Sequence, residues 1–240
     1  MIFFVKNLLL IFFYCVIIFF SNIFKGGCFM NLVILGMPGA GKGTQSAYIS
    51  KFFDIPHIST GDMLRHAIHE KTKIGLEAES YIKAGHFVPD NVILEIMAER
   101  LAEEDCKKGF LLDGFPRNLV QAEELDVMLK NHNLKIDHVI NLSLEQSEVI
   151  SRLTSRRVCK KCASVYNVKN LNSDTCPKCG GEIIIRDDDK EEVIISRLKV
   201  YTEQTEPLVK YFSDKNILFE VDASIAIEDV WNEIKKMLEK

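Results

Sequence analysis

A glycine-rich stretch near the start of the sequence carries the residue types that bind phosphate. Residues 36–44 read GMPGAGKGT, with Lys42 between two glycines. Backbone N–H groups in such a turn can surround phosphate oxygens, and the lysine adds a mobile positive charge. Gly43 stands where the common form of this loop has serine or threonine, so a magnesium-binding hydroxyl is not expected there. The stretch predicts a nucleoside triphosphate site.

A carboxylate follows the apolar run Phe110–Leu112 at Asp113. At the end of a buried strand, an aspartate can hold the Mg²⁺ of a bound nucleotide, here through water. The alternative is that Asp113 only opens the turn at Gly114. We expect the magnesium role, because a phosphate loop is predicted in the same chain.

Four cysteines form two pairs with the spacing of a metal site, Cys159-x2-Cys162 and Cys176-x2-Cys179. Four thiolates favour a structural Zn²⁺, because no position is left open for water. The surrounding segment has too few apolar residues to fold alone, and a metal would replace the missing core. Two disulfides and an iron site are the alternatives. Disulfides are less favoured in a reducing compartment.

The rest of the 240-residue chain alternates short apolar runs with helical patterns. Strands are expected at 32–35, 57–59, 110–113, 138–142 and 217–221. Asp90 is expected to be a helix N-cap, and helices are expected at 145–157, at 189–212 with a break near Pro207, and at 227–238. Such alternation predicts an α/β fold with a parallel sheet covered by helices on both faces.

Composition limits the possible functions. With 47% hydrophobic and 27% charged residues, the chain is neither disordered nor fibrous. Its net charge of −4 argues against a protein that coats nucleic acid, because such proteins are strongly basic.

Residues 1–29 form an apolar leader that includes the continuous run Leu8–Phe20. Three interpretations remain open: an over-extended start with the true start at Met30, a membrane anchor, and a secretory signal. The start at Met30 is favoured, because a buried strand follows it at once. Export is the least favoured, because the expected phosphate chemistry needs intracellular ATP.

Three further stretches decide a resemblance: ISTGDMLR at 58–65, DGFPR at 113–117 and SRLTSRR at 151–157. Together with the P-loop at 36–44, they resemble the adenylate kinase family, in its form with a long zinc-binding lid. The resemblance covers residue 30 to the C-terminus. It implies a doubly wound five-stranded sheet with core segments 30–58, 89–154 and 190–240. It also implies an AMP-binding helical insert at 59–88 and a lid at 155–189.

The resemblance implies the reaction of ATP with AMP to give two ADP, with Mg²⁺. The residues that it assigns to ATP are Gly39, Ala40, Gly41, Lys42, Gly43, Thr44, Arg156, Val165, Tyr166 and the backbone at Ile225. Those that it assigns to AMP are Thr60, Arg65, His86, Phe87, Val88, Gly114, Phe115, Pro116, Arg117, Gln121, Arg186 and Arg197. The acidic pair Asp188 and Asp189 would lie at the lid hinge.

The chemistry of this reaction fits the charged residues. A phosphate acceptor is already anionic at neutral pH, so the reaction needs no general base. It needs positive charge around the phosphates and correct positioning of the two nucleotides. Arginine is suited to this because its planar fork grips two oxygens. The residues expected to act in catalysis are Lys42, Arg117, Arg152, Arg156, Arg186 and Arg197. His57, His66, His69 and His86 are expected to be loop or surface groups that bind no metal.

Rival functions remain. One is a kinase for UMP, CMP or GMP, which Thr60 and Gln121 disfavour. Another is a zinc ribbon that binds nucleic acid, suggested by the basic segment 152–186, and a third is a kinase tethered to a membrane by residues 1–29. We expect a cytoplasmic monomer that binds ATP, AMP and ADP, with no nucleic-acid partner and no membrane contact unless residues 1–29 are retained.

Overall fold

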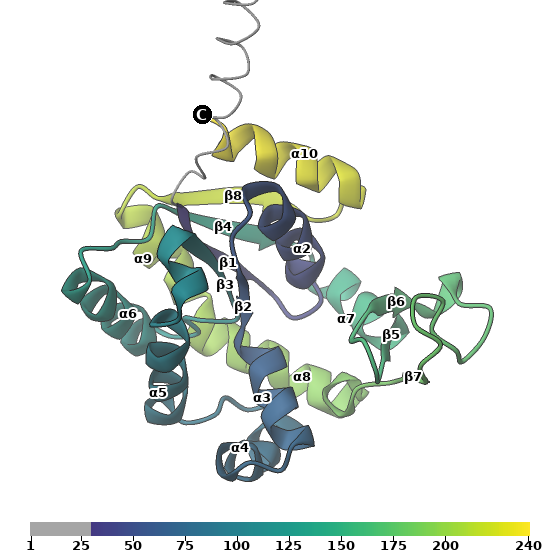
Figure 1. Cartoon of the computed structure of the whole chain (residues 1–240). Helices are drawn as coiled ribbons and strands as arrows, with labels where there is room; N and C mark the ends of the chain where they lie inside the picture. Colours follow the sequence, from purple (N-terminus) through teal and green to yellow (C-terminus); the bar gives the residue numbers. More distant parts are fainter. Residues whose placement is uncertain (1–29) are drawn as a thin grey trace, which may run out of the picture.

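Five parallel strands form the central sheet, in the order β2-β3-β1-β4-β8 (Figure 1). The computed structural model describes residues 30–240, so the predicted leader lies outside the described residues. The strands are β1 Met30–Gly36, β2 His57–Ser59, β3 Gly109–Asp113, β4 His138–Ser143 and β8 Leu218–Asp222. Each overlaps a strand expected from the sequence, and the predicted fold class is confirmed.

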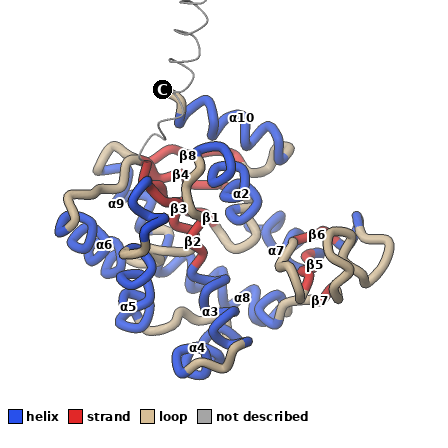
Figure 2. Tube along the Cα trace, in the orientation of Figure 1, coloured by secondary structure: helices blue, strands red, loops and turns tan. Residues whose placement is uncertain are grey.

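Helices cover both faces of this sheet (Figure 2). The central strands are therefore buried on both sides, in two apolar clusters. In β1, Leu32 and Ile34 pack into one apolar cluster, while Val33 and Leu35 pack into the other. The first cluster is covered by α2 Lys42–Phe53, α7 Gln146–Ser155, α8 Glu191–Val200 and α10 Ile227–Leu238. The second is covered by α5 Asp90–Leu101, α6 Leu119–Asn131 and α9 Pro207–Asp214.

Two segments extend beyond the sheet, toward the lower and right-hand sides of Figure 1. The first follows β2 and consists of α3 Thr60–His69 and α4 Lys73–Lys83. The second holds a separate antiparallel sheet in the order β6-β5-β7. Its strands are β5 Arg156–Cys159, β6 Val165–Asn167 and β7 Ile183–Ile184. These elements lie within the ranges predicted for the AMP-binding insert and the lid.

Three helix boundaries differ from the sequence-based expectation. Asp90 is the first helical residue of α5 and not its N-cap, which is Pro89. The helix expected at 145–157 ends at Ser155, because Arg156 begins β5. Between α8 and α9 the backbone forms a π-helical turn, Tyr201–Thr205, ahead of Pro207. Within residues 30–240, no helix is both long and apolar enough to cross a membrane.

Candidate active site

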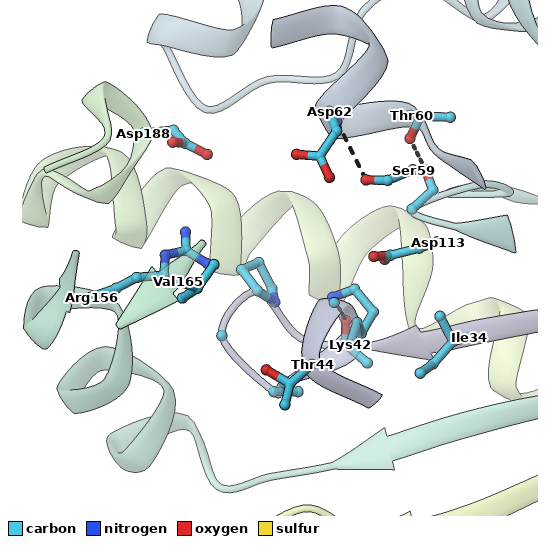
Figure 3. Close-up of a pocket in the computed structure, with 18 of the residues that line it drawn as sticks. Ile34, Lys42, Thr44, Ser59, Thr60, Asp62, Asp113, Arg156, Val165 and Asp188 are labelled. Carbon is cyan, nitrogen blue, oxygen red and sulfur yellow. Dashed lines mark hydrogen bonds between the residues drawn. The ribbon is translucent and has the colours of Figure 1, made fainter. Parts of the chain in front are cut away.

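A cavity of about 1150 Å³ opens where the carboxyl ends of the strands face the two extended segments. In Figure 3, Lys42 and Asp113 lie at its centre, Thr60 and Asp62 approach from α3, and Arg156, Val165 and Asp188 approach from the lid side. In open α/β sheets, ligands bind at this end of the strands. The cavity is therefore the candidate active site.

The P-loop joins β1 to α2 and forms one wall of the cavity. Gly39 and Gly41 have φ of 85° and 97°, which favour glycine, and a Cβ on Gly39 would lie 2.9 Å from Leu153 Cγ. Lys42 Nζ donates to the carbonyl oxygens of Gly36 (2.7 Å) and Met37 (3.0 Å). The loop thus folds back around its own lysine and aligns the first turn of α2 with the cavity.

Burial sets the charge state of Lys42. Desolvation lowers the pKa of its ammonium to about 8, although the nearby Asp113 carboxylate opposes this shift. Repulsion by Arg117, Arg197 and Arg156 lowers the pKa further. The positive groups around Lys42 outnumber the negative ones, and an anionic phosphate would offset this excess. The ligand-free site therefore favours anion binding.

Asp113 is the last residue of β3, and it is 9% exposed. Its Oδ2 lies 3.2 Å from His57 Nε2, and a Cβ on Gly43 would lie 4.0 Å from the same oxygen. A carboxylate beside the phosphate loop suits a hard cation such as Mg²⁺. The expectation that His57 is a loop or surface group is wrong, because it lies in β2 and contacts Asp113.

Six of the described arginines line the cavity, and among them Arg117, Arg156, Arg186 and Arg197 lie close enough to repel Lys42 or one another. Burial, followed by repulsion from other arginines, lowers the pKa of Arg117 and of Arg186 to about 10, so both remain charged at neutral pH. Burial also lowers the pKa of Arg197. The crowding is unfavourable without a ligand and becomes favourable when several phosphates enter.

Two aspartates at the base of the lid hold two of these arginines. Arg156 donates to both carboxylate oxygens of Asp189 at 2.7 and 2.5 Å, and the Asp189 side chain is fully buried. Arg197 Nη1 lies 3.1 Å from Asp188 Oδ2 and 3.1 Å from Asp189 Oδ1. Burial works to raise the pKa of Asp188, but Arg197 and its neighbours override it, and the net pKa is lowered. The junction between lid and core is therefore an ion-pair network.

On the opposite side, the loop after β3 is held against α3. Thr60 Oγ1 donates to the Gly114 carbonyl at 2.7 Å, and Arg117 Nε donates to the same oxygen at 2.7 Å (Figure 3 shows the first bond). The Arg117 guanidinium also lies 4.9 Å from the centre of the Phe87 ring. Arg65, on α3, pairs with Asp62 at 2.6 Å.

Gln121 is 1% exposed, and both ends of its amide have partners. Its Oε1 accepts from Arg117 N–H at 2.8 Å, and its Nε2 donates to Asp90 Oδ1 at 2.7 Å. Asn118 Nδ2 donates to the same Asp90 oxygen at 3.0 Å. Instead of capping its own helix, Asp90 therefore orients the side chain predicted to contact AMP.

Arg152 lies nearer the loop after β8 than the crowded arginines do. Its guanidinium donates to Glu148 Oε1 and to the Ala223 carbonyl, the latter at 2.8 Å. Gln45 Nε2 donates to the Ile227 carbonyl at 2.9 Å. These bonds fix both ends of the segment that contains Ile225, which lines the cavity.

The structure brings nearly all predicted nucleotide-site residues to one cavity. Those that line it are Gly39, Ala40, Gly41, Lys42, Gly43, Thr44, Thr60, Arg65, His86, Phe87, Val88, Asp113, Gly114, Pro116, Arg117, Gln121, Arg152, Arg156, Val165, Tyr166, Arg186, Arg197 and Ile225. Phe115 is the exception, because its side chain is fully buried in the apolar core. Sequence reasoning missed Gln45, Tyr201 and Thr205, which also line the cavity.

The four lid cysteines converge, with their sulfur atoms within 4.8 Å of one another. Cys159 Sγ lies 3.4 Å from Cys179 Sγ, and Cys162 Sγ lies 3.7 Å from Cys176 Sγ. A tetrahedral site with Zn–S bonds of about 2.3 Å places sulfurs about 3.8 Å apart, so the residues fit zinc. No disulfide joins any of the four, so the structure favours a metal site over the alternative of two disulfides.

Comparison with known proteins agrees with this geometry. A family model described as "Adenylate kinase" matches residues 34–217. The adenylate kinase of Archaeoglobus fulgidus is 51% identical over 214 residues, covering 88% of this chain and 99% of the relative. That of Bacillus licheniformis is 48% identical over 212 residues, covering 87% and 98%. The chain belongs to the adenylate kinase family.

Proposed function

We infer that the protein catalyses the reversible, Mg²⁺-dependent transfer of a phosphoryl group from ATP to AMP, which gives two ADP. The observation that carries this inference is the convergence of the P-loop, Asp113 and four partly buried arginines on one cavity. Such a reaction needs dense positive charge around several phosphates and no general base. The described part of the cavity supplies that charge from separate elements of the core and the lid.

The two nucleotides would enter from opposite sides. ATP would bind residues 39–44, with its base toward Ile225 and with Val165 and Tyr166 above it. AMP would bind Thr60, Arg65 and residues 86–88, with its phosphate on Arg117 and its base near Gln121. The arrangement is supported by the spread of these residues along one continuous cavity.

Transfer itself would depend on charge between the nucleotides. The phosphates would be contacted by Lys42, Arg156, Arg186 and Arg197. Asp113 would hold Mg²⁺ through water, and the bound ion would neutralise part of the phosphate charge. Lid movement would exclude water, which would otherwise accept the phosphoryl group. As phosphates arrive, Arg156 and Arg197 would exchange Asp188 and Asp189 for anionic oxygens. For Arg152, the bond to Ala223 favours a contact near the base of ATP.

A structural Zn²⁺ would be held by Cys159, Cys162, Cys176 and Cys179. The distances among these sulfurs support zinc, while four thiolates also suit iron. We further propose a cytoplasmic monomer without a nucleic-acid partner. The absence of a nucleic-acid partner is supported by Arg156 and Arg186 at the base of the lid, because both already line the nucleotide cavity.

A coupled assay on the purified protein tests the proposed reaction. ADP should form from ATP and AMP in the presence of Mg²⁺, and AMP should be preferred over UMP, CMP and GMP as acceptor. Omission of Mg²⁺ is the matched control and should abolish turnover. A clear preference for another monophosphate would contradict the assignment of AMP.

A further inference from the structure

The π-helical turn Tyr201–Thr205 faces the candidate active site. Glu206 N–H donates to the carbonyl of Tyr201 at 2.9 Å, five residues earlier. Pro207 follows, and a proline ring in a regular helix clashes with the carbonyl four residues before it. Tyr201 and Thr205 are 8% and 6% exposed, and both line the cavity. Short π-helical segments occur frequently at functional sites.

Thr205 reaches across the fold to the loop that carries Arg117. Its Oγ1 donates to the Arg117 carbonyl at 2.7 Å, although the two residues are 88 positions apart. The N–H of Arg117 donates to Gln121 Oε1 at 2.8 Å. Buried side chains therefore hold both polar groups of the Arg117 backbone, and the Gly114 carbonyl holds its guanidinium.

These two backbone contacts come from different parts of the molecule. Gln121 lies in the first turn of α6, which directly follows the loop in the chain. Thr205 belongs to the continuous helical segment that begins with α8, which carries Arg197. The Thr205 hydrogen bond thus fixes the loop of Arg117 relative to the helix of Arg197.

We propose that Thr205 is a positioning residue that sets the place of Arg117, and so of the acceptor phosphate, relative to Arg197. The inference rests on the proposed function, because it gives Arg117 the phosphate of AMP. Without the hydroxyl, the Arg117 carbonyl loses a donor in a partly buried place, and its peptide group is free to tilt. A shift of about 1 Å at a reacting group can cost a large factor in rate. ATP contacts on the P-loop would be unaffected.

The test compares Thr205→Val with Thr205→Ser in the full chain. Valine keeps the shape of threonine and removes the donor, whereas serine keeps the donor. Thr205→Val should raise KM for AMP about tenfold and lower kcat, with KM for ATP within about twofold of wild type. Thr205→Ser should restore both values. Calorimetric titration with AMP alone should show the same loss of affinity.

The matched control is Thr154→Val on α7, where the exposed hydroxyl donates to the Ile150 carbonyl of its own helix. It should leave both KM values unchanged. If Thr205→Val does not fold, Thr205→Ala removes the same donor and takes its place.

Two results would overturn the inference: a lowered melting temperature with an unchanged KM for AMP, or an equal rise in both KM values. A wild-type protein without kinase activity would instead contradict the proposed function. AMP titration of wild type and Thr205→Val would still test Thr205 in that case.

Discussion

The two sides of the cavity are held in place by different means. On the sheet side, the P-loop and Asp113 follow strands β1 and β3, whose apolar residues Leu32, Ile34 and Leu111 are fully buried. On the lid side, the buried cluster consists of Cys159, Cys176 and Ile183, with partly buried neighbours that include the other two cysteines. Apolar burial shapes the first side, and thiolate convergence shapes the second.

On the lid side, the arginines that face the cavity lie at the base of the lid, and one of them is held there before a nucleotide binds. Arg156 begins the first lid strand, and Arg186 follows the last one, so both lie at the base of the lid. Arg156 is held there by Asp189. Arg197 on α8 pairs with Asp188 and Asp189, so ion pairs join the base of the lid to the core, while the four cysteines converge within the lid itself.

Loss of charge on the sheet side should have the largest effect. Lys42→Ala and Arg117→Ala should each lower kcat/KM by about 10³-fold or more, because each removes a cation from the transferring phosphates. Melting temperature should change little, since both side chains face the cavity and not an apolar cluster. Steady-state kinetics and thermal melting measure the two quantities.

Lys51→Ala is the matched control for Lys42, because Lys51 lies exposed on the same helix. It should behave as wild type in both measurements. Near-normal activity of Lys42→Ala would remove this lysine from the reaction, and a collapse in stability would mean that the sheet side is not independent of it.

Loss of a thiolate on the lid side should have a smaller effect on activity than on stability. Cys159→Ser should lose the bound Zn²⁺, at one per chain in wild type, and should unfold at a lower temperature. Activity should fall by about tenfold or less, because Arg197 on α8 still pairs with Asp188 and Asp189 and so joins the lid to the core. ATP hydrolysis should rise relative to AMP phosphorylation, because a loosened lid excludes water less well.

Cys106→Ser separates these effects. Cys106 is 3% exposed in the apolar core and contacts Arg100, so its replacement should lower stability without changing the zinc content. Elemental analysis with thermal melting provides the comparison. Zinc-free wild type with full stability, or Cys159→Ser that retains its metal, would contradict the assignment of the lid.

Local patterns explain what the sequence could predict. Short apolar runs identify the five strands, and the residues that form the P-loop lie together in the chain between Gly36 and Thr44. The cysteine pairs likewise define their own spacing. In each case the feature is made by residues that are neighbours in the chain, or by two short groups of neighbours. Residue type and spacing are therefore enough to predict the feature.

The features that could not be predicted depend on contacts between distant residues. The bonds from Thr205 to Arg117, from Asp90 to Gln121 and from His57 to Asp113 each link separate elements. An aspartate before an apolar run looks the same whether it caps its own helix or reaches another one. Phe115 shows the opposite error. Its position in the motif DGFPR predicts a contact with the nucleotide, but its side chain packs in the apolar core.

The smallest expected effect is a proton taken up when ATP binds at alkaline pH. Burial lowers the pKa of Lys42 to about 8, so the free protein loses this proton as the pH rises through that value. Bound phosphates favour the charged ammonium of Lys42. ATP binding should therefore take up most of a proton at about pH 9 and almost none at about pH 7. By linkage, the affinity for ATP should accordingly fall by about tenfold over that interval. Titration calorimetry in buffers of different ionisation enthalpy measures the uptake, and Lys42→Ala is the control that should lack it. Equal uptake at both pH values, or the same uptake in Lys42→Ala, would show that burial on the sheet side does not set the charge of this lysine.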